Sequence, residues 1–218
     1  MIRVAVLCLA APLLLVPAHL SAQEAGAFAI TRGGDTLALE QFTRDSAGLE
    51  ASLTRVSGAA ARERVRYKAV LLPDMSAPLI EVSVWRADDP EDTPARQSAR
   101  VIFKDDSVAV DEANRWTGVR TVVLPTQRSA IAYLNLSVAL MEQATRRAEM
   151  SPGDSVAVPF FNLGGGQTVT GVVRRLAGDS ALVRIGTVEF RLHVDPAGRI
   201  LGGSVPSQGL QITRGAGR

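Results

Sequence analysis

Hydrophobic and polar residues alternate along most of the chain. Val65, Tyr67 and Ala69 alternate with charged residues, and Ile80, Val82 and Val84 repeat the pattern. Residues 36–44 show the same alternation, with Leu37 and Leu39 on one face. Alternation over about four to eight residues is typical of a β-strand with one face in water. The pattern therefore predicts strands over most of residues 27–124 and again over residues 154–213.

One segment departs from this alternation. Residues 129–149 contain no glycine or proline, and Ile131, Leu134, Val138 and Met141 recur at helical spacing. The first turns are apolar on nearly all sides, which is typical of a helix enclosed by other elements. The segment therefore predicts one long buried helix over residues 129–149.

The order of elements is strands, one buried helix, then strands. Short turns rich in Gly and Asp favour antiparallel neighbours. A mainly β fold satisfies both observations: an antiparallel twisted sheet or half-barrel wrapped around one long buried helix (129–149). Two small β-domains joined by the helix are the alternative. We favour the first, because a helix that is apolar nearly all round needs a concave surface to enclose it. The expected single domain spans residues 23–214, and residues 215–218 are expected to form a loose tail.

The first 22 residues have the composition of a secretory signal peptide. Arg3 precedes an apolar run over residues 4–16, and the stretch from Ala18 to Ala22 leads into the polar Gln23. We predict cleavage near Ala22 and export to the periplasm or the extracellular space. No transmembrane segment is expected in the mature chain.

Composition narrows the chemistry of the mature chain. The sequence has 24 Lys+Arg and 22 Asp+Glu residues, with a net charge of +2. Its single cysteine, Cys8, and one of its two histidines, His19, lie in the predicted signal peptide, which leaves His193. Disulfides and thiol chemistry are therefore excluded from the mature form, and we predict no cofactor, no metal and no catalytic residue. An enzyme would have to work with carboxylates and hydroxyls alone. Near-neutral charge also argues against a nucleic-acid partner.

A row of four cations is the sharpest surface feature. Alternate residues of a strand share a face, so these side chains form one stripe. One interpretation is a solvated face, paired with Glu81 or Glu40 on neighbouring strands. The other is contact with an anion, such as a lipid head group, the envelope surface or an acidic partner. The four cations are Arg62, Arg64, Arg66 and Lys68.

Aromatic and aliphatic residues suggest an apolar cavity between the sheet and the helix. Such residues more commonly pack in a core, and this alternative stays open. A sheet curved around one helix would nevertheless form the concave apolar site that lipids use. The candidate lining residues are Trp85, Tyr133, Leu136, Leu140 and Phe160.

The whole pattern resembles a group of exported proteins. A signal peptide, antiparallel strands, one helix, and strands ending in the turn from Val194 to Ile200 look like uncharacterised β-rich envelope proteins of bacteria. Some of these are similar to periplasmic half-barrel lipid carriers. The resemblance implies a non-catalytic binding module for a lipid or other apolar ligand. The alternative is a structural or protein-partner-binding envelope protein with no small ligand.

Overall fold

The computed structural model describes residues 23–57, 61–90, 92–148 and 152–217, so the predicted signal peptide lies outside the described residues. Fifteen strands form one sheet in the order β8-β7-β6-β5-β4-β3-β2-β1-β15-β14-β13-β12-β11-β10-β9. The strands of the first half are β1 (Glu24–Arg32), β2 (Asp35–Arg44), β3 (Gly48–Ser57), β4 (Ala61–Val70), β5 (Leu79–Arg86), β6 (Gln97–Phe103), β7 (Ser107–Asn114) and β8 (Gly118–Pro125). The remaining elements are β9 (Ile131–Tyr133), α1 (Val138–Arg147), β10 (Ser155–Asn162), β11 (Gln167–Arg175), β12 (Ser180–Ile185), β13 (Val188–Val194), β14 (Ile200–Val205), the short 3₁₀ helix η1 (Pro206–Gln208) and β15 (Leu210–Ala216).

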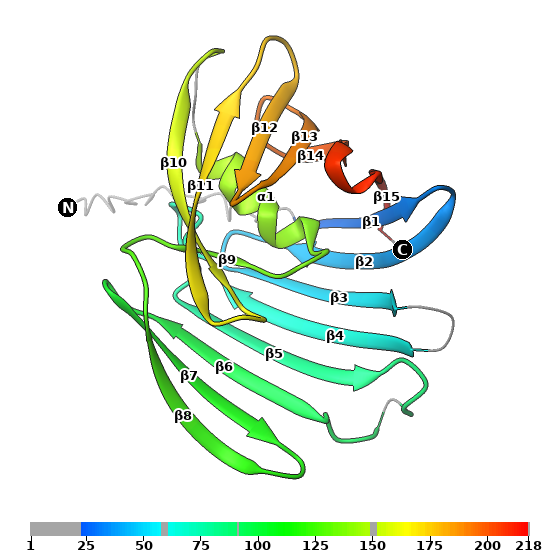
Figure 1. Ribbon diagram of the computed structural model, residues 1–218, viewed down its shortest axis with the longest axis vertical. Coiled ribbons are helices and arrows are strands. Elements are labelled where there is room, and N and C mark those ends of the chain that lie inside the picture. Colours follow the sequence, from blue (N-terminus) through cyan, green and yellow to red (C-terminus); the bar gives the residue numbers. More distant parts are fainter. Residues whose placement is uncertain (1–22, 58–60, 91, 149–151, 218) are drawn as a thin grey trace, which may run out of the picture.

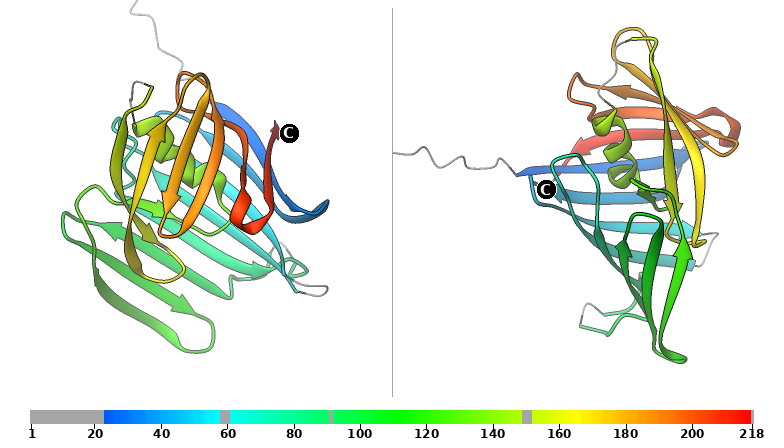
Figure 2. Two further views of the ribbon diagram at one scale, coloured as in Figure 1. Left: turned by 45° about the horizontal axis from the view of Figure 1, so that its top comes forward. Right: turned by 90° about the vertical axis from the view of Figure 1, so that its left-hand side faces the viewer.

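The sheet curves around α1, with β8 at one edge and β9 at the other (Figures 1 and 2). Neighbouring strands are antiparallel, except that β9 runs parallel to β10. The two ends of the described chain meet in the middle of the sheet, because β1 pairs with β15. The mainly β, antiparallel prediction is confirmed, and the strands form one continuous sheet. The last strand extends to Ala216, which pairs with Gly26, so the expected loose tail begins inside a strand.

The helix is much shorter than we predicted. It has 10 residues, and the segment before it forms β9 instead of helix. Ile131–Tyr133 hydrogen-bonds along Phe160–Asn162 of β10, and Leu136 takes a left-handed conformation with φ 65°. Ser137 then caps the helix by accepting from the N–H of Leu140. The predicted burial is confirmed, since every residue from Val138 to Thr145 is buried.

The buried face of β2 is the opposite of the one that the leucines indicate. Leu39 is 52% exposed, whereas Ala38 and Phe42 belong to the core. Glu40 and Arg44 share this inner face and are buried as well. These two charged residues contact the helix, so their polar partners decide the orientation of the strand.

The core fills the concave side of the sheet around α1. Phe28 and Phe42 stack there with ring centroids 5.5 Å apart, and Leu140 of the helix is fully buried. Among the described residues, no helix is long and apolar enough to cross a membrane.

Candidate functional site

One short helix is too small to cover the whole concave face. Ten residues span roughly 15 Å at 1.5 Å per residue, whereas fifteen strands spaced by about 4.8 Å span roughly 70 Å. The inner faces of β3 and β4 are covered, and Leu53, Val65 and Ala69 are buried. Toward β8 the cover is incomplete: Val101, Val108 and Val110 are still buried, whereas Val82 and Val84 of β5 are only half-buried.

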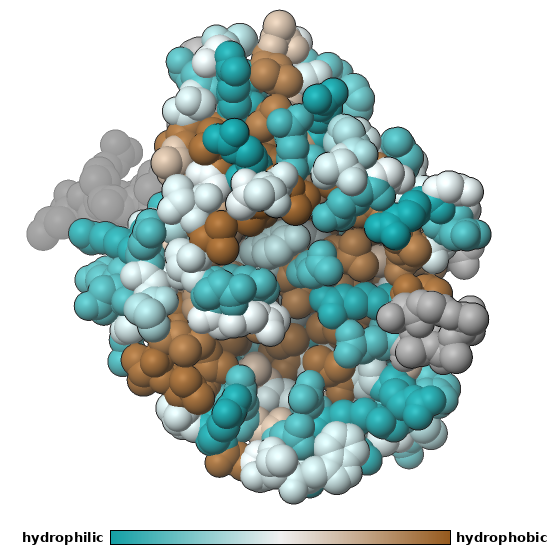
Figure 3. Space-filling view, in the orientation of Figure 1, coloured by the Kyte–Doolittle hydropathy of each residue, from teal (hydrophilic) through white to brown (hydrophobic). Residues whose placement is uncertain are grey.

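Half-buried apolar side chains continue across the inner faces of β5 to β8. Val82 faces Ala99 on β6, and Val122 of β8 lies opposite Val110 of β7. We call this surface the open inner face, and its apolar members are Val82, Val84, Ala99, Phe103, Val122 and Leu124. At one end of it Arg120 forms an ion pair with Glu112, with Nη2 and Oε2 2.6 Å apart. Figure 3 shows several apolar patches on this side of the molecule, separated by polar side chains.

The N-terminus of α1 is held by a buried carboxylate. Glu40 Oε1 accepts from the Tyr67 hydroxyl at 2.8 Å and from Ser137 Oγ at 2.7 Å. Its Oε2 accepts from the backbone N–H groups of Val138 at 2.8 Å and Ala139 at 2.9 Å. A negative charge at this end of a helix suits the helix dipole. Burial nevertheless raises the pKa of Glu40, and the hydrogen bonds from Ser137, Ala139 and Tyr67 offset only part of this rise.

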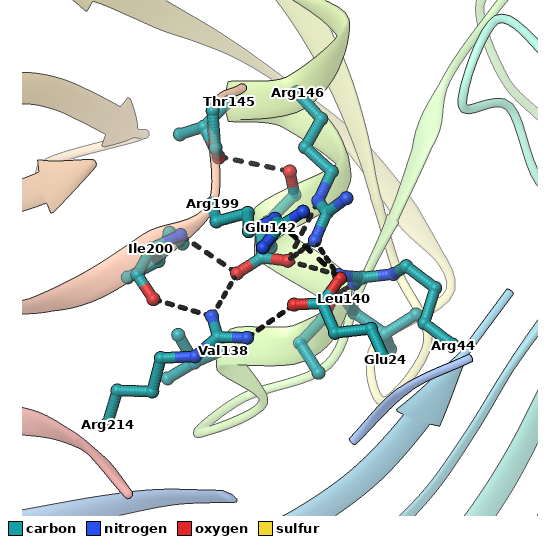
Figure 4. A network of polar contacts seen from close by, with 12 residues as sticks. Glu24, Arg44, Val138, Leu140, Glu142, Thr145, Arg146, Arg199, Ile200 and Arg214 are labelled. Atoms are coloured by element: carbon teal, nitrogen blue, oxygen red, sulfur yellow. Dashed lines mark hydrogen bonds and ion pairs between the residues drawn. The ribbon is translucent and has the colours of Figure 1, made fainter. Parts of the chain in front are cut away.

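The other half of α1 is held by a second buried carboxylate, Glu142 (Figure 4). It accepts from Arg146 Nε at 2.9 Å, from Arg214 Nη1 at 2.8 Å and from the backbone N–H of Ile200 at 2.8 Å. Arg44 also donates to it and places its other terminal nitrogen 2.8 Å from the carbonyl oxygen of Ala139. The side chain of Glu142 is fully buried, and that of Arg44 is 3% exposed.

Glu24 completes this arginine–carboxylate network. It accepts from Arg146 at 2.6 Å and from Arg214 at 2.5 Å. Burial by itself would raise the pKa of Glu24, but the hydrogen bond from Arg146 and the charges of Arg146, Arg44 and Arg214 lower it. The network joins α1 to β1, β2, β14 and β15, where the two ends of the chain meet. Donors occupy its carboxylate oxygens, so this cluster anchors the helix.

The structure does not bring the five predicted cavity residues together. Leu140 and Phe160 are buried in the core, at 0% and 1% exposure. Tyr133 and Leu136 line a pocket of about 30 Å³ near the start of α1, a volume on the scale of a single water molecule. Trp85 lies on the outer face of β5, because its neighbour Val84 faces inward opposite Val65. Trp85 therefore lies on the opposite face of the sheet from the buried Leu140, and ligand contact by these five residues stays a prediction.

The predicted cation row lies on the outer face of β4. Lys68 forms an ion pair with Glu50 at 2.5 Å and faces Glu81 in register, whereas Glu40 lies on the inner face and cannot pair with the row. Arg64 and Arg66 lie over the Trp85 ring, 5.5 Å and 5.6 Å from its centroid. The side chain of Arg62 lies outside the described residues.

Part of this row lines a shallow outer depression of about 510 Å³. Its wall contains Arg66 and Lys68 together with Glu50, Glu81 and Trp85. The two cations and two carboxylates balance one another. The paired interpretation with Glu81 thus agrees with the register, and an anion contact stays a prediction.

The sequence reasoning overlooked the charged residues that anchor the helix. Glu40 and Arg44 alternate with Ala38 and Phe42, which gives two charges on a face that also carries a bulky aromatic residue. That pattern is a usable signal for a buried polar contact. Glu24 and Arg214 carry no such local signal, since their partners are far away in the sequence.

Metal and histidine chemistry find no further support in the described residues. No group of three or more His, Cys, Asp or Glu side chains there is placed to hold a metal ion. His193 is exposed on β13, between buried Leu192 and Val194, as its position in the alternating pattern predicts.

Comparisons with known proteins identify the fold. No protein-family model matches the chain, and no relative is found among curated proteins. A protein of the DUF1089 family from Pseudomonas aeruginosa superimposes with a TM-score of 0.58 at 12% identity, over 82% of this chain and 93% of its own. A β-barrel-like protein of the domain of unknown function DUF1849 from Brucella abortus superimposes with a TM-score of 0.50 at 8% identity, over 89% of this chain and 94% of its own. The chain therefore shares its fold, a strongly curved and mostly antiparallel sheet, with these DUF1089 and DUF1849 proteins.

Proposed function

We propose that this chain is an exported, non-catalytic protein that binds a lipid or another apolar ligand on its open inner face. One observation carries the proposal: on the inner faces of β5 to β8, beside buried valines, several apolar side chains are only half-buried. Val82, Val84 and Phe103 are among them. A ligand that removes this apolar surface from water lowers the free energy of the system.

The anchoring of α1 supports this position for the ligand. Glu40 holds the first turn of the helix, and Glu142 holds its second half. A ligand that displaced the helix would have to break both buried contacts. The open inner face requires no such displacement, so a ligand can lie beside the helix on the side of β8. Each methylene group that it buries contributes about 0.8 kcal/mol.

The polar end of the open inner face suits an amphiphile. The ion pair of Glu112 and Arg120 lies next to Ala99 in register. An acyl chain on the valines would place its polar head near this pair. Charged and hydrogen-bonding groups at one end of an apolar surface commonly orient a ligand.

The test is ligand binding by the purified full chain. Native mass spectrometry and solvent extraction should detect co-purified lipid, and palmitate should displace the fluorescent probe N-phenyl-1-naphthylamine. We expect the double variant Val82→Gln, Val84→Gln to weaken probe binding at least about tenfold, since two polar amides replace apolar contacts. Ser83→Gln is the matched control, because Ser83 lies on the same strand and faces the opposite side.

Two results would reject the proposal. One is the absence of both extractable lipid and saturable probe binding. The other is equal probe binding by the double variant and Ser83→Gln. In either case, a structural or protein-binding role without a small ligand would become the better account.

A further inference from the structure

Strand β8 is an open edge of the sheet. It is the last strand in the sheet order, and only β7 pairs with it among the described strands. β11 approaches β8 near its C-terminal end, where the hydroxyl oxygens of Thr126 and Thr168 lie 2.8 Å apart. Open edges promote association, and proteins commonly protect them with charges. Here the one charged residue, Arg120, lies on the inner side in an ion pair with Glu112.

Exposed apolar side chains concentrate on this edge. Trp116 in the β7–β8 turn is 66% exposed, and Val119 and Val123 of β8 are 77% and 65% exposed. The two valines lie on the outer face, since the intervening Val122 opposes Val110 of the core. β8 therefore offers unpaired backbone groups and apolar side chains together.

The hydrogen-bond pattern shows which backbone groups are available. The N–H of Thr126 donates to the carbonyl oxygen of Asp106 at 2.9 Å, one step beyond the register pair of Pro125 and Ser107. Antiparallel ladders alternate between bonded and non-bonded pairs. The even-numbered residues of β8 therefore bond to β7. Val119, Thr121 and Val123 direct their N–H and C=O groups away from it.

These positions are self-complementary. We propose that two copies of the chain join their β8 strands antiparallel around a two-fold axis, with Thr121 opposite Thr121 of the second copy. Val119 then faces Val123 of the second copy, and by symmetry Val123 faces Val119 of the second copy. Val119, Thr121 and Val123 all have outward backbone groups, so the register forms three bonded pairs and about six backbone hydrogen bonds.

The charges of the outer face agree with this register. Glu81, Arg100 and Asp111 alternate in sign along one row across β5 to β7. The row ends on the neutral Thr121, whose hydroxyl donates to Asp111 at 2.8 Å. Two rows therefore meet at threonines, and no like charges oppose one another.

The expected association is modest. A paired edge of about seven residues buries less than the roughly 1,200 Å² typical of stable interfaces. In the proposed register Trp116 faces Thr126 of the second copy, which adds apolar contact at both ends. We expect a dimer that dissociates as the protein is diluted through the micromolar range.

Disulfide cross-linking tests the register. In a background where Cys8 is replaced by Ser, Thr121→Cys should form a disulfide dimer under mild oxidation. Its two Cα atoms would lie about 5.5 Å apart, within the range for disulfides. Val119→Cys and Val123→Cys are matched controls: neither should cross-link alone, because identical positions lie about 14 Å apart. Their mixture should cross-link.

Sedimentation equilibrium tests the association itself, with the chain without cysteine substitutions as the reference. We expect Val119→Lys with Val123→Lys to raise the dimer dissociation constant at least about tenfold, since both apolar pairs are lost. Leu39→Lys, an exposed leucine on β2, should leave it unchanged. The proposal is overturned if the chain is monomeric at all concentrations, if the double variant dimerises normally, or if the three cysteine variants cross-link equally.

Discussion

Neutralising Glu142 should destabilise the protein severely. The Glu142→Gln variant keeps the shape of the side chain but removes a fully buried charge that faces Arg44, Arg146 and Arg214. Arg44, with a side chain 3% exposed, would lose its carboxylate partner. Removing one partner of a buried ion pair costs about 3–5 kcal/mol. For a domain of this size, that loss lowers Tm by roughly 10 °C.

A double-mutant cycle isolates the interaction between Glu142 and Arg44. Arg44→Met removes the buried cation and keeps most of its volume. The combined variant Glu142→Gln, Arg44→Met should therefore cost at least about 1.5 kcal/mol less than the sum of the single losses. Urea denaturation followed by circular dichroism measures all four free energies of unfolding. The reasoning is refuted if Glu142→Gln costs under about 1 kcal/mol, or if the two losses add within about 0.5 kcal/mol.

Three further predictions test other parts of the structure. Burial raises the pKa of Glu40 above 4.5, so the folded state binds the carboxyl proton more tightly than the unfolded state does. The wild type therefore loses stability as the pH rises from that value. Glu40→Gln should remove this loss, and urea titrations between about pH 4 and 8 would contradict us if the stability difference between the two proteins were constant. Gly198→Ala should cost at least about 2 kcal/mol, because φ is 76° and a Cβ would lie 2.5 Å from the carbonyl oxygen of Thr145; an unchanged Tm would be inconsistent with that contact. On β2, Leu39→Ser should change stability by under about 0.5 kcal/mol and Phe42→Ser by about 3 kcal/mol or more, and the reverse order in thermal melts would restore the face that the leucines indicate.

The successes of the sequence reasoning share one cause. Alternation at Val65, Tyr67 and Ala69 predicts a strand with its inner face in the core, and all three residues are buried. The burial of the helix also follows from its apolar composition between Val138 and Ala144. Both properties depend on residues that are close in the sequence.

The failures concern choices between locally similar alternatives. Residues 129–137 have helix-forming composition, yet Ile131–Tyr133 becomes a strand because β10 supplies hydrogen bonds to it. Trp85 is a large aromatic residue of the kind that lines apolar cavities, but the register of β5 places it on the outer face. The neighbours that decide these cases come from distant parts of the chain.

The candidate site divides in the same way. The cation row could be predicted, since Arg64, Arg66 and Lys68 share a face through strand geometry alone. The anchors of α1 could not, since Glu142 meets Arg44 across 98 positions of sequence and Glu24 meets Arg214 across 190. The alternation around Arg44 signals a buried polar contact, but nothing near it in the sequence identifies the distant partner.

By itself, the sequence determined the class of the fold, which has alternating strands and one buried helix. It also restricts thiol chemistry to Cys8. Tertiary structure alone decided which face of β2 is buried, where α1 begins, and which strands remain uncovered. The physical reason is that periodicity expresses the shape of a single element. Burial of a charge or exposure of a valine depends on what the rest of the chain brings to it. A helix of 10 residues inside a sheet of 15 strands leaves β5 to β8 partly open, and only the assembled sheet reveals that surface.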